Sequence, residues 1–255
     1  MSDVIVEVED LVAHYGTTKV LDGISFDVRE REIFVLIGGS GSGKSTLLKH
    51  MCGLLIPTSG QIRFRGADLA QMDEDTLSRM QRNIGIAFQS SGLFNSLNVG
   101  DNVALPLREY TDYDAATIEA LVRMKLSLVG LAQAKDLMPS ELSGGMKKRA
   151  GLARALALDP PLLYFDEPSA GLDPITASGL DNLILDLRNL LGITIVIVTH
   201  ELDSIRTITD RLLMLDRGKA IFCGGLQEAQ ENGPPRVRQF FERRPDAFIS
   251  QRPAV

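Results

Sequence analysis

Hydrophobic residues follow two different patterns along the chain, and these patterns predict strands of two kinds. Apolar and polar residues alternate in part over residues 4–8 and 24–28, as they do in antiparallel strands with one solvent-exposed face. Continuous apolar runs, typical of parallel strands covered on both faces, occupy residues 34–37, 162–165 and 193–198, the last with Thr194 as its one polar residue. The chain therefore predicts an antiparallel part near its N-terminus and a buried parallel sheet.

Helical periodicity fills much of the sequence between these strands. Apolar residues recur at helical spacing over residues 47–55 and 180–191, and the Pro-Thr-Ser-Gly sequence of residues 57–60 predicts a turn after the first helix. From about residue 101 the pattern is mainly helical, and we place an inserted helical subdomain at about residues 90–158. Strands that alternate with helices predict an α/β fold with helices flanking a parallel sheet.

A glycine-rich loop stands between the strand at residues 34–37 and a helix that begins near Lys44. The backbone N–H groups of such a loop can approach phosphate oxygens, and the helix N-terminus adds a partial positive charge. We expect Lys44 to reach the β- and γ-phosphates of a nucleotide and the Ser45 hydroxyl to ligate Mg²⁺. The alternative, a glycine-rich turn with a solvated lysine, is disfavoured by the flanking strand and helix. The loop fits the pattern G-x-x-x-x-G-K-[ST] with Gly38, Gly39, Ser40, Gly41, Ser42, Gly43, Lys44 and Ser45, followed by Thr46.

Two carboxylates follow the buried strand at residues 162–165. Asp166 and Glu167 stand at the carboxyl end of a parallel strand, which is where α/β sheets bind ligands. Adjacent residues of a strand face opposite ways, so the two carboxylates need not share one role. The alternative is a pair of surface carboxylates ahead of Pro168, but a functional pair fits the end of a buried strand better.

A second candidate anion site lies between the phosphate loop and the carboxylates. Ser143, Gly144 and Gly145 open a helix that runs toward Leu158, so their amides can bind an anion. They belong to the Leu-Ser-Gly-Gly-Met sequence of residues 142–146, called the signature segment below. This order of motifs, with the signature segment between the phosphate loop and the carboxylates, resembles that of the ABC (ATP-binding cassette) ATPases. The resemblance runs from about residue 4 to residue 233.

This resemblance implies a fold and a domain organisation. The implied fold is the α/β phosphate-loop ABC ATPase fold, with a RecA-like parallel-sheet core, an N-terminal antiparallel β subdomain and the inserted helical subdomain. The ATPase domain then spans residues 1–233. Residues 234–255 form a C-terminal tail with a short amphipathic, basic helix, in which Val237, Phe240 and Phe241 share one face. That face packs either on the tail's own domain or on another subunit.

The resemblance also implies roles for four residues around the γ-phosphate. Asp166 holds Mg²⁺ through water, and Glu167 is the general base that polarises the attacking water. Gln89, after the apolar residues 84–88, matches the glutamine that contacts Mg²⁺ and the attacking water. His200 matches the switch histidine that contacts the γ-phosphate, although a histidine at a strand end is more often structural.

A head-to-tail dimer is implied as well. In the family, each ATP is held between the phosphate loop of one subunit and the signature segment of the other. Asp173 belongs to the D-loop (residues 169–173), which crosses that interface. Tyr15 matches the aromatic residue that stacks on adenine, with a surface or core tyrosine as the alternative. Met146 departs from the commoner glutamine, but the serine and glycines that meet phosphate are intact.

Composition and charge narrow the class further. The chain has 255 residues, 44% of them apolar, and a mean hydropathy of +0.05, and no apolar run approaches the ~20 residues of a membrane-spanning helix. We expect no secretory signal, because no basic segment followed by an apolar core begins the chain. Two cysteines give no disulfide or metal framework. A net charge of −6 argues against a general nucleic-acid binder.

Three segments point to one branch of the family. Residues 101–107, 141–149 and 173–176 look like the ATPases of bacterial Mce-type lipid transporters, especially the Mla (maintenance of lipid asymmetry) phospholipid system. The implied function is powering phospholipid transport between the inner and outer membranes, at the cytoplasmic face of the bacterial inner membrane. The implied partners are a second copy of the chain, a membrane permease, an Mce-domain lipid-binding protein and a small STAS-type accessory subunit, and no nucleic acid.

Two other interpretations stay open. A non-transport ABC ATPase of translation or DNA repair is one, although those proteins carry two cassettes or long coiled-coil insertions and this chain has one uninterrupted cassette. The other is an ABC importer ATPase for an amino acid, a metal or a drug. Only the three segments above argue against it, because the cassette does not touch the cargo.

Overall fold

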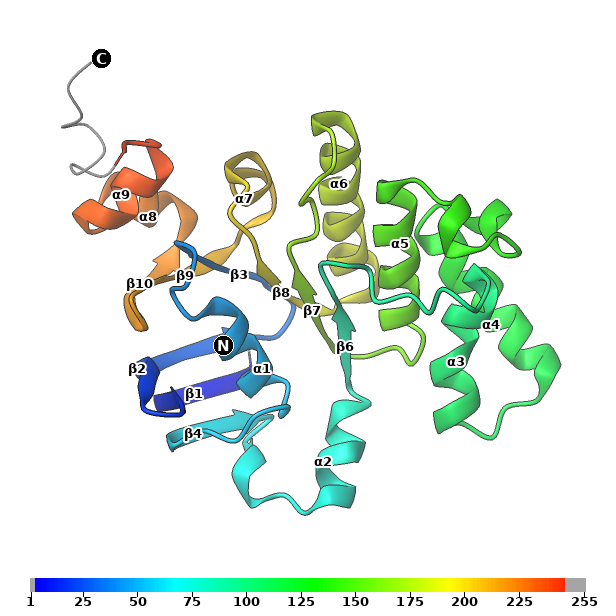
Figure 1. The fold of residues 1–255 in the computed structure, drawn as a ribbon, viewed down its shortest axis with the longest axis horizontal. Coiled ribbons are helices and arrows are strands. Elements are labelled where there is room, and N and C mark those ends of the chain that lie inside the picture. The colour runs from blue at the N-terminus through cyan, green and yellow to red at the C-terminus, as the bar shows by residue number, and fades with distance from the viewer. Residues whose placement is uncertain (1–2, 246–255) are drawn as a thin grey trace.

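A six-stranded sheet forms the centre of the molecule in the computed structural model, which describes residues 3–245 (Figure 1). Its strand order is β10-β9-β3-β8-β7-β6. All neighbouring strands run parallel except the edge strand β10, which pairs with β9 in antiparallel fashion. The strands are β3 (Ile33–Gly38), β6 (Ile84–Ala87), β7 (Leu162–Asp166), β8 (Thr194–Val198), β9 (Arg211–Asp216) and β10 (Lys219–Gly225). The predicted buried parallel sheet is confirmed.

A second, antiparallel sheet of four strands contains the N-terminal segments. Its order is β2-β1-β4-β5, with β1 (Val4–Tyr15), β2 (Thr18–Arg29), β4 (Ser59–Phe64) and β5 (Ala67–Asp68). The strands β1 and β2 extend well beyond the segments with alternating polarity, because shifts of register interrupt the alternation between Val8 and Tyr15. The turn expected at residues 57–60 is partly wrong, since Ser59 and Gly60 already belong to β4.

Helices surround the two sheets. The α-helices are α1 (Lys44–Met51), α2 (Glu74–Gln81), α3 (Val99–Tyr110), α4 (Ala115–Leu128), α5 (Gly144–Ala155), α6 (Pro174–Leu191), α7 (Leu202–Ile208), α8 (Leu226–Glu231) and α9 (Pro235–Phe241). Short 3₁₀ helices lie at Leu69–Gln71, Ala132–Ala134 and Pro139–Glu141. Within residues 3–245, none of the helices has the length and apolar character to cross a membrane.

Side-chain caps fix where several helices begin. The first helical amides lack backbone partners, and a preceding Asp, Asn or Ser side chain can accept hydrogen bonds from them. Five helices, α2, α3, α4, α5 and α6, start in this way after Asp73, Asn98, Asp114, Ser143 and Asp173. Two of these caps, Ser143 and Asp173, are also predicted site residues.

The central strand β3 divides the core into two apolar clusters. Ile33, Val35 and Ile37 pack in the cluster that also contains buried residues of α3 to α9. Phe34 and Leu36 pack in the cluster formed with the antiparallel sheet and α1. Successive side chains of a strand face opposite sides, so one short strand joins both layers. Figure 1 places the helical part (green) at the opposite end of the molecule from α8 and α9 (orange to red).

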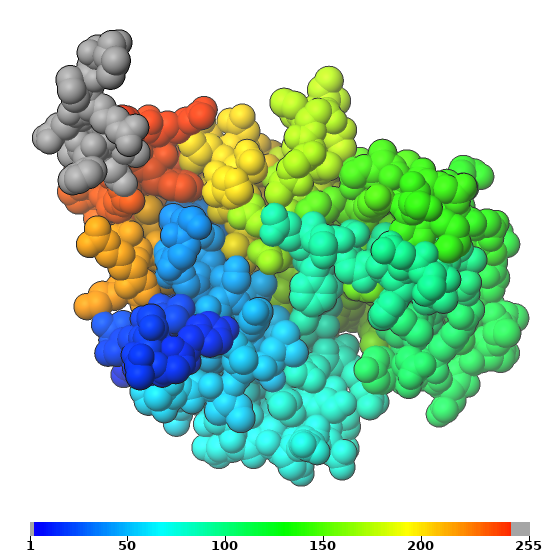
Figure 2. Space-filling view, in the orientation of Figure 1, coloured from blue at the N-terminus to red at the C-terminus, as the bar shows by residue number. Residues whose placement is uncertain are grey.

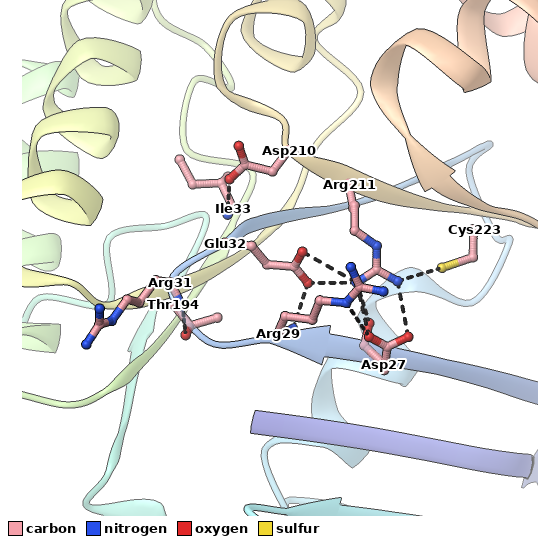
Figure 3. Close-up of polar contacts among 9 residues, drawn as sticks. All are labelled: Asp27, Arg29, Arg31, Glu32, Ile33, Thr194, Asp210, Arg211 and Cys223. Atoms are coloured by element: carbon pink, nitrogen blue, oxygen red, sulfur yellow. Dashed lines mark hydrogen bonds and ion pairs between the residues drawn. The ribbon is translucent and has the colours of Figure 1, made fainter. Parts of the chain in front are cut away.

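A polar network ties the antiparallel sheet to the central one (Figure 3). The Arg211 guanidinium on β9 donates to Asp27 on β2 at 3.1 Å and to Glu32, just before β3, also at 3.1 Å. Its contact with the Cys223 sulfur on β10 measures 3.9 Å. Arg211 is largely buried, with 17% of its side chain exposed, so the ion pairs hold the two sheets in a fixed relation.

The helix α9 is the predicted amphipathic helix of the tail. Val237 and Phe241 are buried in the same cluster as the central sheet, and Phe240 packs against it. The Arg206 side chain on α7 donates to the Phe241 carbonyl at 3.2 Å. The apolar face of α9 therefore packs on its own chain, and Figure 2 shows this segment (red) lying against the yellow segment of the surface. The remainder of the predicted tail, residues 246–255, lies outside the described residues.

Candidate nucleotide-binding and hydrolysis site

The phosphate loop joins β3 to α1, as the sequence predicts. Two of its glycines are required by the backbone. Gly38 has φ +148°, and a Cβ there would lie 2.3 Å from the Leu215 carbonyl oxygen. Gly43 has φ +104°, and a Cβ there would lie 2.6 Å from Cδ2 of Leu21. Close approach to β9 and β2 therefore fixes the path of the loop.

Lys44 and the two carboxylates form one electrostatic cluster. The Lys44 ammonium donates to the carbonyls of Gly38 at 2.8 Å and Gly39 at 2.9 Å. Burial lowers the pKa of Lys44, and the nearby charges of Glu167 and Asp166 oppose that shift. Burial and the neighbouring Glu167 together raise the pKa of Asp166. The loop and the carboxylates thus lie close enough to act on one phosphate chain.

Glu167 is held in an unusual conformation directly after β7. The strand ends at Asp166, and Glu167 has φ +47°, which is uncommon for a residue other than glycine. Its amide donates to the Val198 carbonyl on β8 at 2.8 Å. Only 12% of its side chain is exposed. The sequence predicts Asp166 and Glu167 as neighbours on one strand, but the structure turns Glu167 out of the strand.

His200 contacts the Glu167 carboxylate. Nδ1 of His200 lies 2.8 Å from Oε1 of Glu167, so the ring N–H donates to the carboxylate. The other oxygen, Oε2, is buried and has no hydrogen-bond partner within residues 3–245. The imidazole itself is 59% exposed. A carboxylate with one anchored and one unpartnered oxygen suits the activation of a water molecule.

A lysine that the sequence analysis did not select lies beside this carboxylate. The Lys148 ammonium on α5 donates to the carbonyls of Gln89 and Glu167, each at 2.7 Å. Lys148 is buried, with 6% exposed. Helical spacing gave a usable signal, because Gly145, Lys148 and Leu152 recur at intervals of three and four and share the buried face of α5.

Gln89 begins the Q-loop (residues 89–92) two residues after β6. Its side chain is exposed, and its carbonyl is the group that Lys148 binds. Since β6 and β7 are parallel neighbours, with Ala87 paired to Phe165, Gln89 and Glu167 emerge at the same edge of the sheet. The structure therefore brings together Gln89, Glu167 and His200, three residues predicted from separate parts of the sequence.

The signature segment contacts the D-loop and the first turn of α6 in its own chain. A Cβ on Gly144 would lie 3.5 Å from Cδ2 of Leu172, and one on Gly145 would lie 2.5 Å from Cγ2 of Thr176. The Ser143 hydroxyl accepts from the Met146 amide at 3.3 Å. Figure 1 shows that α5, which starts in the segment, and α1, which follows the phosphate loop, lie apart. The two predicted anion sites of one chain thus belong to different regions of the molecule.

Asp173 and Tyr15 have defined positions at the margins of the site. The Asp173 carboxylate caps α6, accepting from the Ile175 amide at 3.1 Å and the Thr176 amide at 3.0 Å. Tyr15 is the last residue of β1 and is 51% exposed. No hydrogen bond joins either side chain to the phosphate loop within the described residues.

The residues around the carboxylates fit a magnesium ion. Mg²⁺ prefers oxygen ligands, and it is usually bound by one or two carboxylates together with phosphates and water. Asp166 is a partly buried carboxylate, and the Ser45 hydroxyl is exposed at the start of α1. The buried, unpartnered Oε2 of Glu167 adds an acceptor for a water molecule.

Comparison with known families agrees with this combination of sheet, loop and carboxylates. Residues 21–170 match the model of the ABC transporter family. The match covers more than half of the chain, so the chain belongs to this family. Within it, the chain is an ATPase with the ABC fold that the sequence predicts.

Individual relatives cover nearly the whole chain. The chain is 43% identical, over 93% of its length and 88% of the relative's, to the intermembrane phospholipid transport system ATP-binding protein MlaF of Escherichia coli K12. It is 40% identical, over 94% of its length and 67% of the relative's, to the probable ribonucleotide transport ATP-binding protein mkl of Mycobacterium tuberculosis H37Rv.

A solved structure shows a similar fold in a dimeric state. The dimeric, post-hydrolysis structure of the ATP-binding cassette MJ0796, bound to ADP and Pi, superposes with a TM-score of 0.80. It is 29% identical and covers 87% of this chain and 99% of its own. The similarity in sequence and fold supports the ABC ATPase assignment made from the motifs.

Proposed function

We propose that this chain is the ATP-hydrolysing subunit of a phospholipid transporter that works between the inner and outer membranes. The observation that carries this proposal is the extent of the similarity to MlaF, which includes the helical part as well as the phosphate loop. We place the ATPase domain at residues 1–233, with the helical subdomain at about 90–158. The working unit is a homodimer docked beneath a separate membrane permease.

In the proposed reaction, the phosphate loop binds the phosphates of ATP. Lys44 turns from its loop carbonyls to the β- and γ-phosphates, and the Tyr15 ring stacks on adenine. Glu167 takes a proton from the attacking water, while His200 orients the carboxylate and contacts the γ-phosphate. Ser45, Gln89 and Asp166 would hold Mg²⁺, which would supply positive charge to stabilise the transferred phosphoryl group.

The signature segment completes the site of the opposite subunit. Ser143, Gly144 and Gly145 provide amides at the start of α5 that bind phosphate from the far side of the nucleotide. The separation of α1 and α5 within one chain supports an arrangement across two chains. Asp173 lies at this interface, where its negative charge and the cap of α6 shape the D-loop.

The proposed assembly has further components. An Mce-domain protein would hold lipid beyond the permease, and a small STAS-type subunit would bind the ATPase. The ATPase would be located at the cytoplasmic face of the inner membrane. These assignments derive from the resemblance to Mla and Mce systems, and co-purification with the products of the neighbouring genes tests them.

The catalytic assignment is tested by Glu167→Gln. The amide cannot accept a proton from water, so we expect hydrolysis to fall by about 10² to 10⁴ while ATP binding is retained. Steady-state phosphate release and nucleotide binding by the purified transporter measure the two quantities. A variant that hydrolyses ATP at the wild-type rate would show that another group is the base.

The cargo is tested in cells that carry Lys44→Ala. If phospholipid is the cargo, this strain shows phospholipid in the outer leaflet and a permeable outer membrane, as does a strain that lacks the gene. Lys49→Ala, an exposed lysine on the same helix, is the matched control and leaves the envelope intact. The name of the mkl relative favours a ribonucleotide as the second candidate cargo. An intact envelope with failed ribonucleotide uptake would select that cargo instead.

A further inference from the structure

Lys148 is a buried positive charge to which the reaction scheme assigns no role. Its ammonium is enclosed at 6% exposure and bonded to two backbone carbonyls, those of Gln89 and Glu167. Burial of an ammonium is costly unless its hydrogen-bond donors have partners. Burial lowers the pKa of Lys148, and the charges of Glu167 and Asp166 counteract the shift. The two carbonyls are therefore the hydrogen-bond partners that stabilise a positive charge at this buried position.

The two carbonyls belong to loops that meet at one edge of the sheet. Gln89 follows β6 and Glu167 follows β7, and these strands are parallel neighbours. Within residues 3–245, the Lys148 side chain is the one that hydrogen-bonds both loops. It reaches them from α5, the helix that begins in the signature segment.

Glu167 needs such support because its backbone is strained. A residue other than glycine rarely adopts φ +47°, and this strained conformation persists only where its surroundings fix it. The Val198 carbonyl fixes the amide of Glu167 at 2.8 Å. Lys148 fixes its carbonyl, which also accepts from the Ala170 amide at 3.3 Å. Loss of these anchors would let the Glu167 backbone leave this conformation and carry the carboxylate away from His200.

The helix α5 holds the Q-loop at two additional points. A Cβ on Gly151 would lie 2.6 Å from the Ser91 carbonyl oxygen, so the helix backbone and the loop are in close contact. The Arg154 side chain donates to the Gly92 carbonyl at 2.5 Å. The Q-loop and α5 are thus packed as one unit, and Lys148 connects this unit to Glu167.

We propose that Lys148 is a positioning residue for ATP hydrolysis, which fixes the backbone of Glu167 relative to the Q-loop and to the helix of the signature segment. Lys148 touches neither substrate nor reacting atoms, and it acts through the position of the carboxylate. A displacement of α5 is transmitted to the general base through this ammonium. The proposal rests on the role assigned to Glu167 under the proposed function.

Lys148→Met tests the proposal, because methionine has a similar length and no donor. A misplacement of about 1 Å at a catalytic group can cost roughly 10²-fold in rate, so we expect kcat to fall by about 10- to 10²-fold. The KM for ATP and the nucleotide affinity stay within about twofold of wild type, because the phosphate loop is untouched. Lys147→Met is the matched control, since Lys147 forms no hydrogen bond through its side chain within the described residues and should keep wild-type kcat.

A double-mutant cycle separates positioning from a general structural role. Residues that act as a unit give non-additive effects, so Lys148→Met should reduce the residual rate of Glu167→Gln by less than about twofold. Lys148→Arg keeps a cationic donor and should retain more activity than Lys148→Met. If the methionine variant does not fold, the kcat of Lys148→Arg relative to wild type tests the proposal instead. A wild-type kcat for Lys148→Met, or losses that multiply in the cycle, would overturn the proposal. Wild-type turnover by Glu167→Gln would instead overturn the general-base assignment, a result distinct from either.

Discussion

Several charged side chains of this protein bind backbone groups rather than other charges. Lys44 donates to two carbonyls of the phosphate loop, and Lys148 donates to the carbonyls of two separate loops. Asp173 accepts from two amides of α6. Hydrogen bonds to charged groups are stronger than neutral ones, so each of these residues fixes the local path of the chain. The shape of the site therefore depends on side chains that make no contact with each other.

The buried carboxylate of Asp181, which lines a pocket with Ser169 and Leu172 of the D-loop, gives a prediction about pH. Asp181 on α6 is 4% exposed, its Oδ2 accepts from the Ser204 hydroxyl at 2.8 Å, and its Oδ1 has no partner within the described residues. Burial raises the pKa of Asp181 above its ordinary value of 3.8. The folded state therefore binds this proton more tightly than the unfolded state, and stability falls as the pH rises from 3.8 through the folded-state pKa.

Asp181→Asn should consequently stabilise the protein at neutral pH. The amide carbonyl still accepts from Ser204 and carries no charge, so we expect a higher Tm at pH 7, by roughly 2–4 °C for each kcal/mol recovered. The gain should shrink as the pH falls toward 3.8, where the wild-type carboxyl is protonated. Thermal unfolding over this pH range measures the effect, with the exposed Asp186→Asn as the control. A lower Tm at pH 7 for Asp181→Asn would contradict the prediction.

At the scale of elements, the sequence predicted types of structure better than their limits. The phosphate loop between β3 and α1 and the carboxylates after β7 follow from short-range patterns, and they lie where expected. The helix expected over residues 47–55 ends at Met51, because Gly53 takes a left-handed conformation with φ +67°. The extra length of β1 and β2 arises from pairing with irregular register, which periodicity does not report.

Lys148 shows what sequence patterns miss. Helical spacing places Lys148 on the buried face of α5, but it does not reveal the two carbonyls, from loops distant in sequence, that Lys148 binds there. Those loops come together only when β6 and β7 pair. The pairing of His200 with Glu167 likewise depends on the neighbouring ends of β7 and β8. Contacts of this kind follow from strand order, which the sequence alone does not supply.

The cap of α6 provides a prediction that separates two roles of Asp173. Asp173→Ala removes the acceptor for two helix amides and should cost about 1 kcal/mol of folding stability. Asp173→Asn keeps the cap and loses only the charge, so its stability should remain near wild type. Chemical denaturation measures stability, and ATP hydrolysis is followed in parallel. If Asp173→Asn is stable but inactive, the charge acts at the dimer interface; equal destabilisation of both variants would contradict the capping role.

The packing of α9 predicts that the C-terminal helix stabilises its own domain. Phe241 is 5% exposed within the main apolar cluster, and truncation of a buried phenylalanine to alanine typically costs about 3–5 kcal/mol. Phe241→Ala should therefore lower the denaturation midpoint strongly. Phe240→Ala is the comparison, because Phe240 is only partly buried and should cost less. An unchanged denaturation midpoint for Phe241→Ala would contradict this prediction and leave contact with another subunit as the role of α9.

At the scale of the whole molecule, the parts of the site are distributed over two regions. The phosphate loop, the carboxylates and His200 lie at the edge of the central sheet, whereas the signature segment contacts the D-loop at the start of α5. Each region contains a helix start, where an anion can bind. This arrangement favours a dimer in which both regions act on one nucleotide and form a composite site.

Purified mixed dimers test the composite site most directly. One dimer pairs a Ser143→Arg subunit with a Lys44→Ala subunit, so in the composite arrangement one site carries both changes and the other carries none. The second dimer pairs a subunit that carries both changes with a wild-type subunit, which damages both composite sites. We predict measurable ATP hydrolysis by the first dimer and almost none by the second. Hydrolysis by the second dimer with none by the first would mean that each chain acts on its own nucleotide.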